Sequence, residues 1–268
     1  SVSVDSEYVG AGGSFTVGGL SRYDVIELSM EAQAAGVKIS GNRITVPSET
    51  AKGTAIEFDV YSIFDKTKKQ TLSVSVVESS EITLDGVYDV EIESGDTFEI
   101  DFGEYDSKIT GSLQSAVMDD AAFGSSSYSG GKLTLDTASL VGSWGEKTIV
   151  ATFMHENNGV VESVTMVSVN VDIVTMIIND EAELNRFLDV AEENKIGNSR
   201  MGVFKLGNDI VCTGTYASHY VDGDTRGTIG VAAGFNGTFD GQGYTIYNLH
   251  TVGDRGGFVG PLGEPGVV

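Results

Sequence analysis

The chain has 268 residues, 40% of them hydrophobic, and its 39 acidic and 16 basic residues give a net charge of −23. The apolar content suffices for ordinary cores and excludes global disorder, while 35 glycines with three prolines and no Gly-X-Y period exclude collagen. The charge balance excludes nucleic acid, which requires clustered Lys and Arg, and disfavours anionic membrane surfaces. No apolar run approaches the ~18 residues of a membrane span, so we expect no membrane insertion within this chain.

Residues 1–79 show the pattern of an all-β domain. Strands are expected at Ser14–Val17, Lys38–Ser40, Arg43–Val46, Ala55–Tyr61 and Thr71–Val77. The last two alternate apolar and polar residues, as half-buried strands do. A hairpin loop is expected at Asp65–Gln70, and a short helix at Ile26–Ala35 that Gly36 ends.

Residues 80–173 repeat this plan. ISGNRITVPSETA, from Ile39, aligns with YSGGKLTLDTASL, from Tyr128, at an offset of 89 positions, and GGSFTV aligns with SGDTFEI. Asn158-Gly159 supplies the positive φ angles of a tight hairpin. A repeat of this length with many short strands predicts two tandem immunoglobulin-sized β-sandwiches. Both segments resemble the bacterial immunoglobulin-like domains of surface proteins, which act as spacers or adhesive modules.

Residues 174–268 begin with a helix signal. Asn179 and Asp180 offer capping side chains, and acidic residues follow at the positive end of the helix dipole. One apolar face predicts an amphipathic helix to about Asn194. The face comprises Ala182, Leu184, Phe187, Leu188 and Ala191.

A glycine-rich stretch, FNGTFDGQGYTIYNLHTVGDRGGFVG, follows from Phe235 to Gly260. Its glycines separate short β-rich pieces, as the corners of a parallel β-helix require. Together with FKLGNDIVCTG, it resembles the glycine-rich right-handed β-helix of bacterial surface proteins with GLUG-type repeats, over residues 177–263. The resemblance implies a β-helix whose open end the helix caps.

The matching residues fall into three rungs. The first rung has Lys205, Leu206, Asn208, Asp209 and Ile210; the second has Phe235, Gly237, Thr238, Phe239, Asp240, Gly241, Gly243, Thr245, Ile246, Asn248 and Leu249; the third has Gly257, Phe258, Gly260 and Leu262. Because the family runs on for further rungs, we expect this chain to be a fragment of a longer protein. The alternative is a short third domain that borrows packing from the second.

The acidic residues of the second segment are the best candidate site outside the coil. Asp89, Glu91 and Glu93 alternate along one strand, and Glu99 and Asp101 along the next. A Ca²⁺ ion between paired strands is one interpretation, and a solvated strand face that discourages aggregation is the favoured one. For the loop acids at Asp119-Asp120 and Asp222-Gly223-Asp224 the same two interpretations apply, and solvated acids are again the favoured one.

Other reactive side chains form no motif. His155, His219 and His250 lack metal-ligand spacing, and Cys212 is expected to be a buried apolar side chain. Asp240 is expected to form a turn. The cations near the coil are Lys205, Arg226 and Arg255. Tyr216, Tyr220 and Tyr244 are candidates for stacking on a sugar ring, but ordinary packing is the favoured role of these aromatic residues. We therefore assign no catalytic, cofactor-binding or metal-binding residue and no cofactor.

The predicted protein is all-β: sandwiches at 1–79 and 80–173, then a capping helix and the first rungs of a β-helix at 174–268. The resemblances imply a non-catalytic bacterial protein, secreted or at the cell surface, with a stalk or adhesion role and an extracellular glycan or host surface protein as its partner. The alternative is a polysaccharide lyase or glycoside hydrolase whose β-helix extends beyond this chain.

Overall fold

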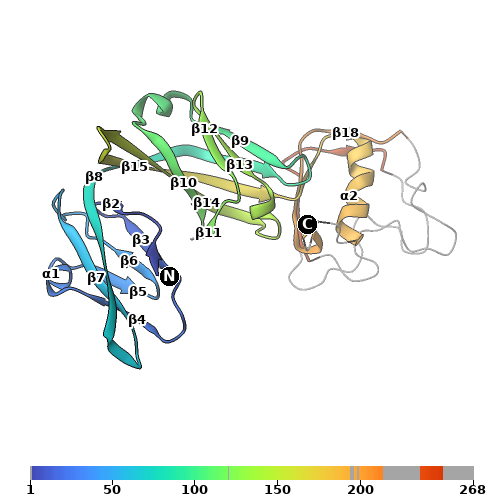
Figure 1. Ribbon diagram of the computed structural model, residues 1–268. Coiled ribbons are helices and arrows are strands. Elements are labelled where there is room, and N and C mark those ends of the chain that lie inside the picture. The colour runs from blue at the N-terminus through green and yellow to red at the C-terminus, as the bar shows by residue number, and fades with distance from the viewer. Residues whose placement is uncertain (1, 120, 194–195, 198, 214–235, 250–268) are drawn as a thin grey trace. The chain divides into compact units, whose positions relative to one another are not determined.

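The computed structural model describes residues 2–119, 121–193, 196–197, 199–213 and 236–249 (Figure 1). Those residues form an all-β protein of sandwich-like sheets, as predicted. They divide into two compact units. The first comprises Ser1–Leu84, Gly103–Ala116 and Val150–Ser168, and the second comprises Asp85–Phe102, Val117–Ile149 and the chain from Val169.

One sheet of the N-terminal sandwich has the strand order β1-β3-β6-β5 and is antiparallel. Its strands are β1 (Ser3–Val4), β3 (Ser14–Gly18), β5 (Lys38–Ser40) and β6 (Arg43–Thr45). Apolar residues alternate with polar ones along β3, so that Phe15 and Val17 are buried between exposed or half-buried neighbours. The predicted strands at these positions are confirmed.

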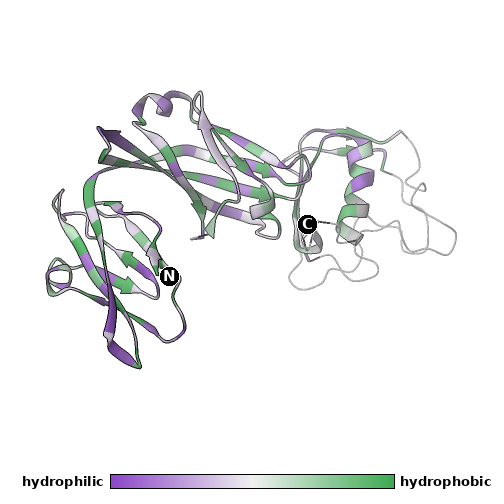
Figure 2. Cartoon of the chain, in the orientation of Figure 1, coloured by the Kyte–Doolittle hydropathy of each residue, from purple (hydrophilic) through white to green (hydrophobic). Residues whose placement is uncertain are grey.

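The facing sheet contains β4 (Asp24–Leu28), β7 (Ala55–Ser62) and β8 (Asp65–Glu91), with β2 (Tyr8–Gly10) parallel to β8. The Phe15 and Phe58 rings, 5.8 Å apart, contact one another in the core between the sheets. Figure 2 shows the alternation of hydrophobic and hydrophilic residues along these strands.

Of two local predictions in this sandwich, one holds only in part and the other is wrong. The helix expected at Ile26–Ala35 is instead strand β4 followed by a short α1 (Met30–Ala34), because Ser29 caps the helix by accepting the Ala32 N–H at 3.1 Å. The loop expected at Asp65–Gln70 belongs to β8, and the β7–β8 hairpin turns earlier, at Ile63 and Phe64.

The predicted repeat is also present in the strand pairing. Strands β9 (Thr97–Asp101), β13 (Lys132–Asp136) and β12 (Ser126–Ser129) form a sheet of order β12-β13-β9, which matches β5-β6-β3 in pairing and antiparallel sense. The segments aligned in sequence therefore occupy equivalent strands. Two 3-10 helices, Gly103–Lys108 and Ala138–Leu140, flank this sheet in sequence.

The other strands of this region follow the order β11-β10-β14-β15-β8. They are β10 (Ser112–Met118), β11 (Ala121–Ala122), β14 (Gly145–Asn157) and β15 (Val160–Val174). The β14–β15 hairpin turns at Asn158 and Gly159, with φ of 51° and 79°, as predicted. Strand β8 runs without interruption through residues 79 and 80, and the three-domain division remains a prediction.

The last described region contains parallel strands and one long helix. Strands β16 (Met176–Ile178), β17 (Val203–Leu206) and β19 (Thr238–Asp240) pair in parallel, as do β18 (Ile210–Val211) and β20 (Ile246–Tyr247). Helix α2 spans Glu181–Glu193, and a 3-10 turn follows at Ser199–Met201. The strand pairs described in this region are all parallel, whereas in the preceding regions the parallel pair β2–β8 stands among antiparallel ones.

Helix α2 packs on this parallel sheet through its apolar face. Leu184, Phe187, Val190 and Ala191 are buried, and the Phe187 ring lies 4.6 Å from Phe204 and 5.3 Å from Phe239. The amphipathic helix is confirmed, with two differences. Ala182 is exposed rather than part of the face, and the side chain of Leu188 lies outside the described residues.

Candidate functional site

The acidic end of strand β8 carries a network of polar contacts in the second unit. Val90 is buried with an exposed fraction of 2%, so Asp89 and Glu91 project from the opposite face, as their alternation predicted. Glu93 was expected on the same strand, but β8 ends at Glu91 and Glu93 lies in the turn that follows. This strand does not pair with β9 in any described ladder, and β9 instead pairs with β13. The two acidic strands therefore do not face one another in a described ladder.

Lys205 on β17 forms ion pairs with two of the nearby carboxylates. Its Nζ lies 2.8 Å from Asp89 Oδ1 and 2.6 Å from Asp172 Oδ2, and its side chain is only 13% exposed. Burial lowers the pKa of Lys205, but hydrogen bonds to Asp172 and Asp89 outweigh it, so the net pKa is raised above the ordinary 10.5. The ammonium group is therefore held charged between two strands.

The Glu91 side chain accepts a hydrogen bond from the backbone of strand β16. Its Oε1 accepts the N–H of Ile177 on β16 at 2.7 Å. Burial raises the pKa of the Glu91 carboxyl; the Ile177 N–H opposes that shift, while the charges of Glu183 and Glu93 add to it. This carboxylate is thus held in a position where its charged form is disfavoured.

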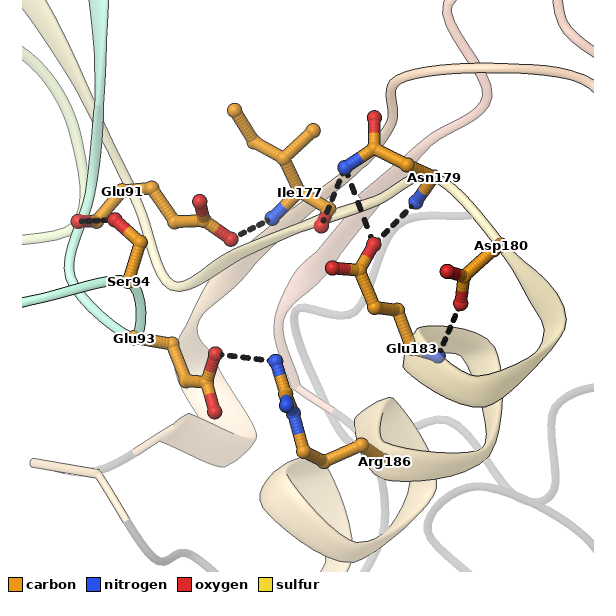
Figure 3. A network of polar contacts seen from close by, with 8 residues as sticks. All are labelled: Glu91, Glu93, Ser94, Ile177, Asn179, Asp180, Glu183 and Arg186. Carbon is orange, nitrogen blue, oxygen red and sulfur yellow. Dashed lines mark hydrogen bonds and ion pairs between the residues drawn. The ribbon is translucent and has the colours of Figure 1, made fainter.

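Helix α2 joins the same network through its first two turns, as Figure 3 shows. Arg186 donates to Glu93 at 2.7 Å. The Glu183 carboxylate accepts the Asn179 N–H at 2.7 Å, and the Glu183 N–H donates to Asp180 at 2.8 Å. Asp180 is therefore the residue whose side chain caps the helix.

The connection from β15 to β16 is the single residue Thr175, which is fully buried. Its N–H donates to Val203 O at 2.7 Å, its carbonyl accepts the Glu93 N–H at 3.2 Å, and its Oγ1 accepts the Val203 N–H at 3.1 Å. A Cβ at Gly202 would collide with the Thr175 hydroxyl, so glycine permits this close approach. The connection has every polar group bonded to protein.

We call Asp89, Glu91, Glu93, Asp172, Thr175, Arg186 and Lys205 the carboxylate network. Its acids receive hydrogen bonds from protein donors, and no group of three or more metal-ligating side chains occurs among the described residues. Glu99 pairs with Lys132 at 3.2 Å, on the sheet that also contains Asp101. The Ca²⁺ interpretation remains a hypothesis, and its test is a thermal shift with Ca²⁺ that disappears in Glu91→Gln/Asp101→Asn.

A shallow pocket of about 340 Å³ also lies in the second unit. Its lining residues are Val87, Glu146, Lys147, Thr148, Asn170 and Val171. Lys147 pairs with Asp119 at 3.0 Å, and the Thr148 hydroxyl donates to Asn170 Oδ1 at 3.0 Å. These groups bond to one another, which is how a solvated strand face behaves.

The remaining sequence candidates are placed as follows. Cys212 is 3% exposed, and burial, then the charge of Glu181, raises the pKa of its thiol, which keeps it a neutral apolar side chain. Asp240 accepts the Gln242 N–H at 2.9 Å, as a turn residue does. Tyr244 is 44% exposed. His155 lies on β14.

The other candidates lie outside the described residues. They are Asp120, Tyr216, His219, Tyr220, Asp222, Gly223, Asp224, Arg226, Phe235, His250, Arg255, Gly257, Phe258, Gly260 and Leu262. The sequence analysis missed Asp172, Thr175 and Arg186. Arg186 carried a usable signal, because it is the one basic residue in the span of α2.

No protein-family model and no curated protein sequence matches this chain. Among solved structures, similarity is found to SGBP-B of the Bacteroides ovatus mixed-linkage glucan utilization locus in complex with a heptasaccharide (14% identity, TM-score 0.22, 62% of this chain). This chain spans 44% of that protein.

Two further structures have comparable scores. Human mucin-like protocadherin EC1-2 is 12% identical with a TM-score of 0.22, covering 66% of this chain and 99% of that one. Sidekick-1 immunoglobulin domains 1–5 are 14% identical with a TM-score of 0.21, covering 65% and 41%. Likenesses this distant carry no argument about function. Within the described residues, neither helix has the length and apolar character of a membrane span.

Proposed function

We propose that this chain is a non-catalytic modular protein of a bacterium, secreted or at the cell surface, which acts as a stalk that presents binding surfaces to an extracellular glycan or a host surface protein. The division into sandwiches at 1–79 and 80–173 and a β-helix start at 174–268 is part of the proposal. The parallel pairs β16-β17-β19 and β18-β20, covered by α2, support the β-helix.

The observation that carries the proposal is the one-residue connection at Thr175. A flexible linker would expose its backbone to water and leave the two sides free to reorient. Here the connecting backbone is bonded on both sides, and Lys205, Glu91 and Arg186 add three further links. A stiff connection transmits force and holds a distal surface at a fixed position, which a stalk requires.

The experiment is single-molecule stretching of the chain between its termini. We expect Lys205→Met to lower the unfolding force of the event that includes the carboxylate network, because Asp89 and Asp172 lose their shared cation. Lys132→Met, which removes an exposed pair with Glu99, is the matched control and should leave the force unchanged.

A parallel assay measures turnover on a panel of acidic and neutral polysaccharides. We expect neither new reducing ends nor unsaturated products. Release of either product would overturn the non-catalytic part of the proposal and support a lyase or glycosidase. An unfolding force that is the same in Lys205→Met and the parent chain would overturn the stalk.

A further inference from the structure

The β7–β8 hairpin of the first sandwich ends in two large apolar side chains. Ile63 is 55% exposed and Phe64 is 75% exposed, and they form the whole loop between the paired residues Ser62 and Asp65. Tyr23, 38% exposed, lies beside them with its ring centroid 5.1 Å from that of Phe64. We call Tyr23, Ile63 and Phe64 the aromatic tip.

Ile63 and Phe64 are not residues that the turn of a β-hairpin favours. Two-residue hairpin loops favour Gly, Asn and Asp, whose small or polar side chains suit both the backbone and the solvent. The equivalent hairpin of the second repeat, β14–β15, follows this rule with Asn158 and Gly159. The two loops differ in conformation, because Ile63 and Phe64 are not among the residues with positive φ and the β7–β8 register shifts between Tyr61 and Ser62. The first repeat still exposes apolar side chains at the position where its counterpart has polar turn residues.

Hydrogen bonds within the chain hold the backbone of the aromatic tip in place. The Ile63 N–H donates to Tyr23 O at 2.9 Å, which ties the hairpin to the loop that precedes β4. That loop is held in turn, because the Ser21 N–H donates to Asp24 Oδ2 at 2.7 Å and the Tyr23 N–H donates to Ser21 Oγ at 3.2 Å. A surface held in this way loses little entropy on binding.

Basic side chains lie near the tip, and acidic partners pair with the lysines among them. The Arg22 guanidinium lies 4.6 Å from the Tyr23 ring centroid, and the Lys66 ammonium lies 4.8 Å from that of Tyr61. The side chains of Lys66 and Lys68 are 70% and 86% exposed, and their contacts to Glu27 and Asp65, at 3.9 Å and 3.3 Å, are loose surface pairs. Residues 1–79 hold seven of the 16 basic residues and ten of the 39 acidic ones.

We propose that the aromatic tip is a docking knob for a partner protein that presents an apolar pocket with an acidic rim. The inference rests on the proposed adhesion role and deepens it. Aromatic side chains with a neighbouring arginine are the usual anchors of protein interfaces. A cationic edge on a chain of net charge −23 complements Asp and Glu around such a pocket.

Two other surfaces fit the tip less well. An anionic bilayer extends beneath the whole chain, whose net charge is −23, whereas the rim of a pocket faces only the tip. A saccharide needs hydrogen-bonding groups beside a stacking ring, whereas the most exposed side chains of the tip, Phe64 and Ile63, have none. A concave protein pocket buries both side chains and pairs the cations at its rim.

The probe is a displayed library of cyclic random peptides, selected on the full 268-residue chain. We expect selected sequences that combine aromatic or aliphatic residues with Asp and Glu. Their affinity, measured by calorimetry, should fall at least about 10-fold with Phe64→Ser and with Arg22→Glu/Lys66→Glu, and stay within about 3-fold with Phe64→Tyr. Met30→Ser is the matched control, because Met30 is 80% exposed but lies in α1, outside the tip.

Folding is checked with Ile63→Asn/Phe64→Gly, which installs the loop of the second repeat. We expect its Tm to equal or exceed that of the parent, because exposed apolar residues add little stability. A marked fall in Tm would mean that the tip is structural and would overturn the proposal.

Other results also overturn the proposal: no enriched peptides, or peptides that bind this double variant equally well. Binding to phosphatidylglycerol vesicles or to arrayed glycans that Phe64→Ser abolishes would reassign the tip to that ligand. None of these outcomes affects the stretching experiment, so the docking proposal and the stalk proposal can be overturned independently.

Discussion

Lys205 is the residue on which the carboxylate network depends most, because one ammonium group serves both Asp89 and Asp172. Replacing it with Met keeps the apolar stem and leaves two carboxylates without their cation. We expect a loss of about 2 kcal/mol in unfolding free energy, below the roughly 3–5 kcal/mol of a fully buried pair because Asp89 is 42% exposed.

Chemical denaturation measures this loss. The matched change Lys132→Met removes an ion pair whose side chains are 49% and 57% exposed, and should cost at most about 0.5 kcal/mol. Equal effects of the two substitutions would mean that the network contributes no more than an ordinary surface pair.

Glu91 should give the stability curve a pH dependence. Because burial raises the pKa of Glu91 in the folded state, the folded protein binds its proton more tightly than the unfolded chain. The stability from this group is complete below the ordinary pKa of 4.5 and is lost as the pH rises through the folded pKa.

Glu91→Gln removes this loss and can still accept the Ile177 N–H through its amide oxygen. We therefore expect the variant to be more stable than the parent at pH 7, with the difference vanishing near pH 4. Glu93→Gln is the control and should have the opposite sign at pH 7, because it weakens a 2.7 Å pair with Arg186. Thermal melts of the parent and both variants between pH 4 and pH 7 measure these differences in stability.

At the scale of elements, α2 and the parallel strands are held together by aromatic packing. The Phe187 side chain is fully buried and contacts the rings of Phe204 and Phe239. We expect Phe187→Ala to cost about 3–4 kcal/mol, from lost burial and the cavity left behind. The control Ala182→Ser on the exposed side of the same helix should cost less than about 0.5 kcal/mol. Amide hydrogen exchange in β17 would rise with the first substitution and stay unchanged with the second.

Elements with a strong period or a defined turn were predictable from the sequence. The alternation in Ala55–Tyr61, the Asn158-Gly159 turn and the apolar face of α2 each follow from one local rule. The prediction of a helix at Ile26–Ala35 holds for Met30–Ala34 and fails for the first residues of that span, which pair with β7 as an edge strand because long-range pairing outweighed local propensity.

The sequence predicted the acidic residues of the candidate site but not the residues that pair with them. The alternation of Asp89, Glu91 and Glu93 placed them on one face, but their partners lie far away in sequence, Lys205 being 116 residues from Asp89. A pattern within one strand specifies which side chains share a face and says nothing about what covers it. The exposed Phe64 was missed for a related reason, since the loop was expected at Asp65–Gln70.

At the scale of the whole molecule, the two compact units predict how the chain unfolds. The first sandwich has its own core around Phe15 and Phe58, and the region of α2 has another around Phe187. Cores that share no residues unfold as separate cooperative transitions unless the structure between them couples them. Strand β8, which runs from Asp65 to Glu91 without a break, is the covalent path for such coupling.

Differential scanning calorimetry separates these cases. We expect Phe58→Ala to lower one transition and Phe187→Ala to lower another, with the effects of the double variant adding within about 0.5 kcal/mol, because the two residues share no partner. Lys205→Met should lower the same transition as Phe187→Ala, since both substitutions act on the segment that begins at Met176. If all three substitutions lowered one shared transition instead, β8 would be transmitting the stability of each core to the other. The stalk would then be a single mechanical unit from end to end, which yields at one force rather than in steps.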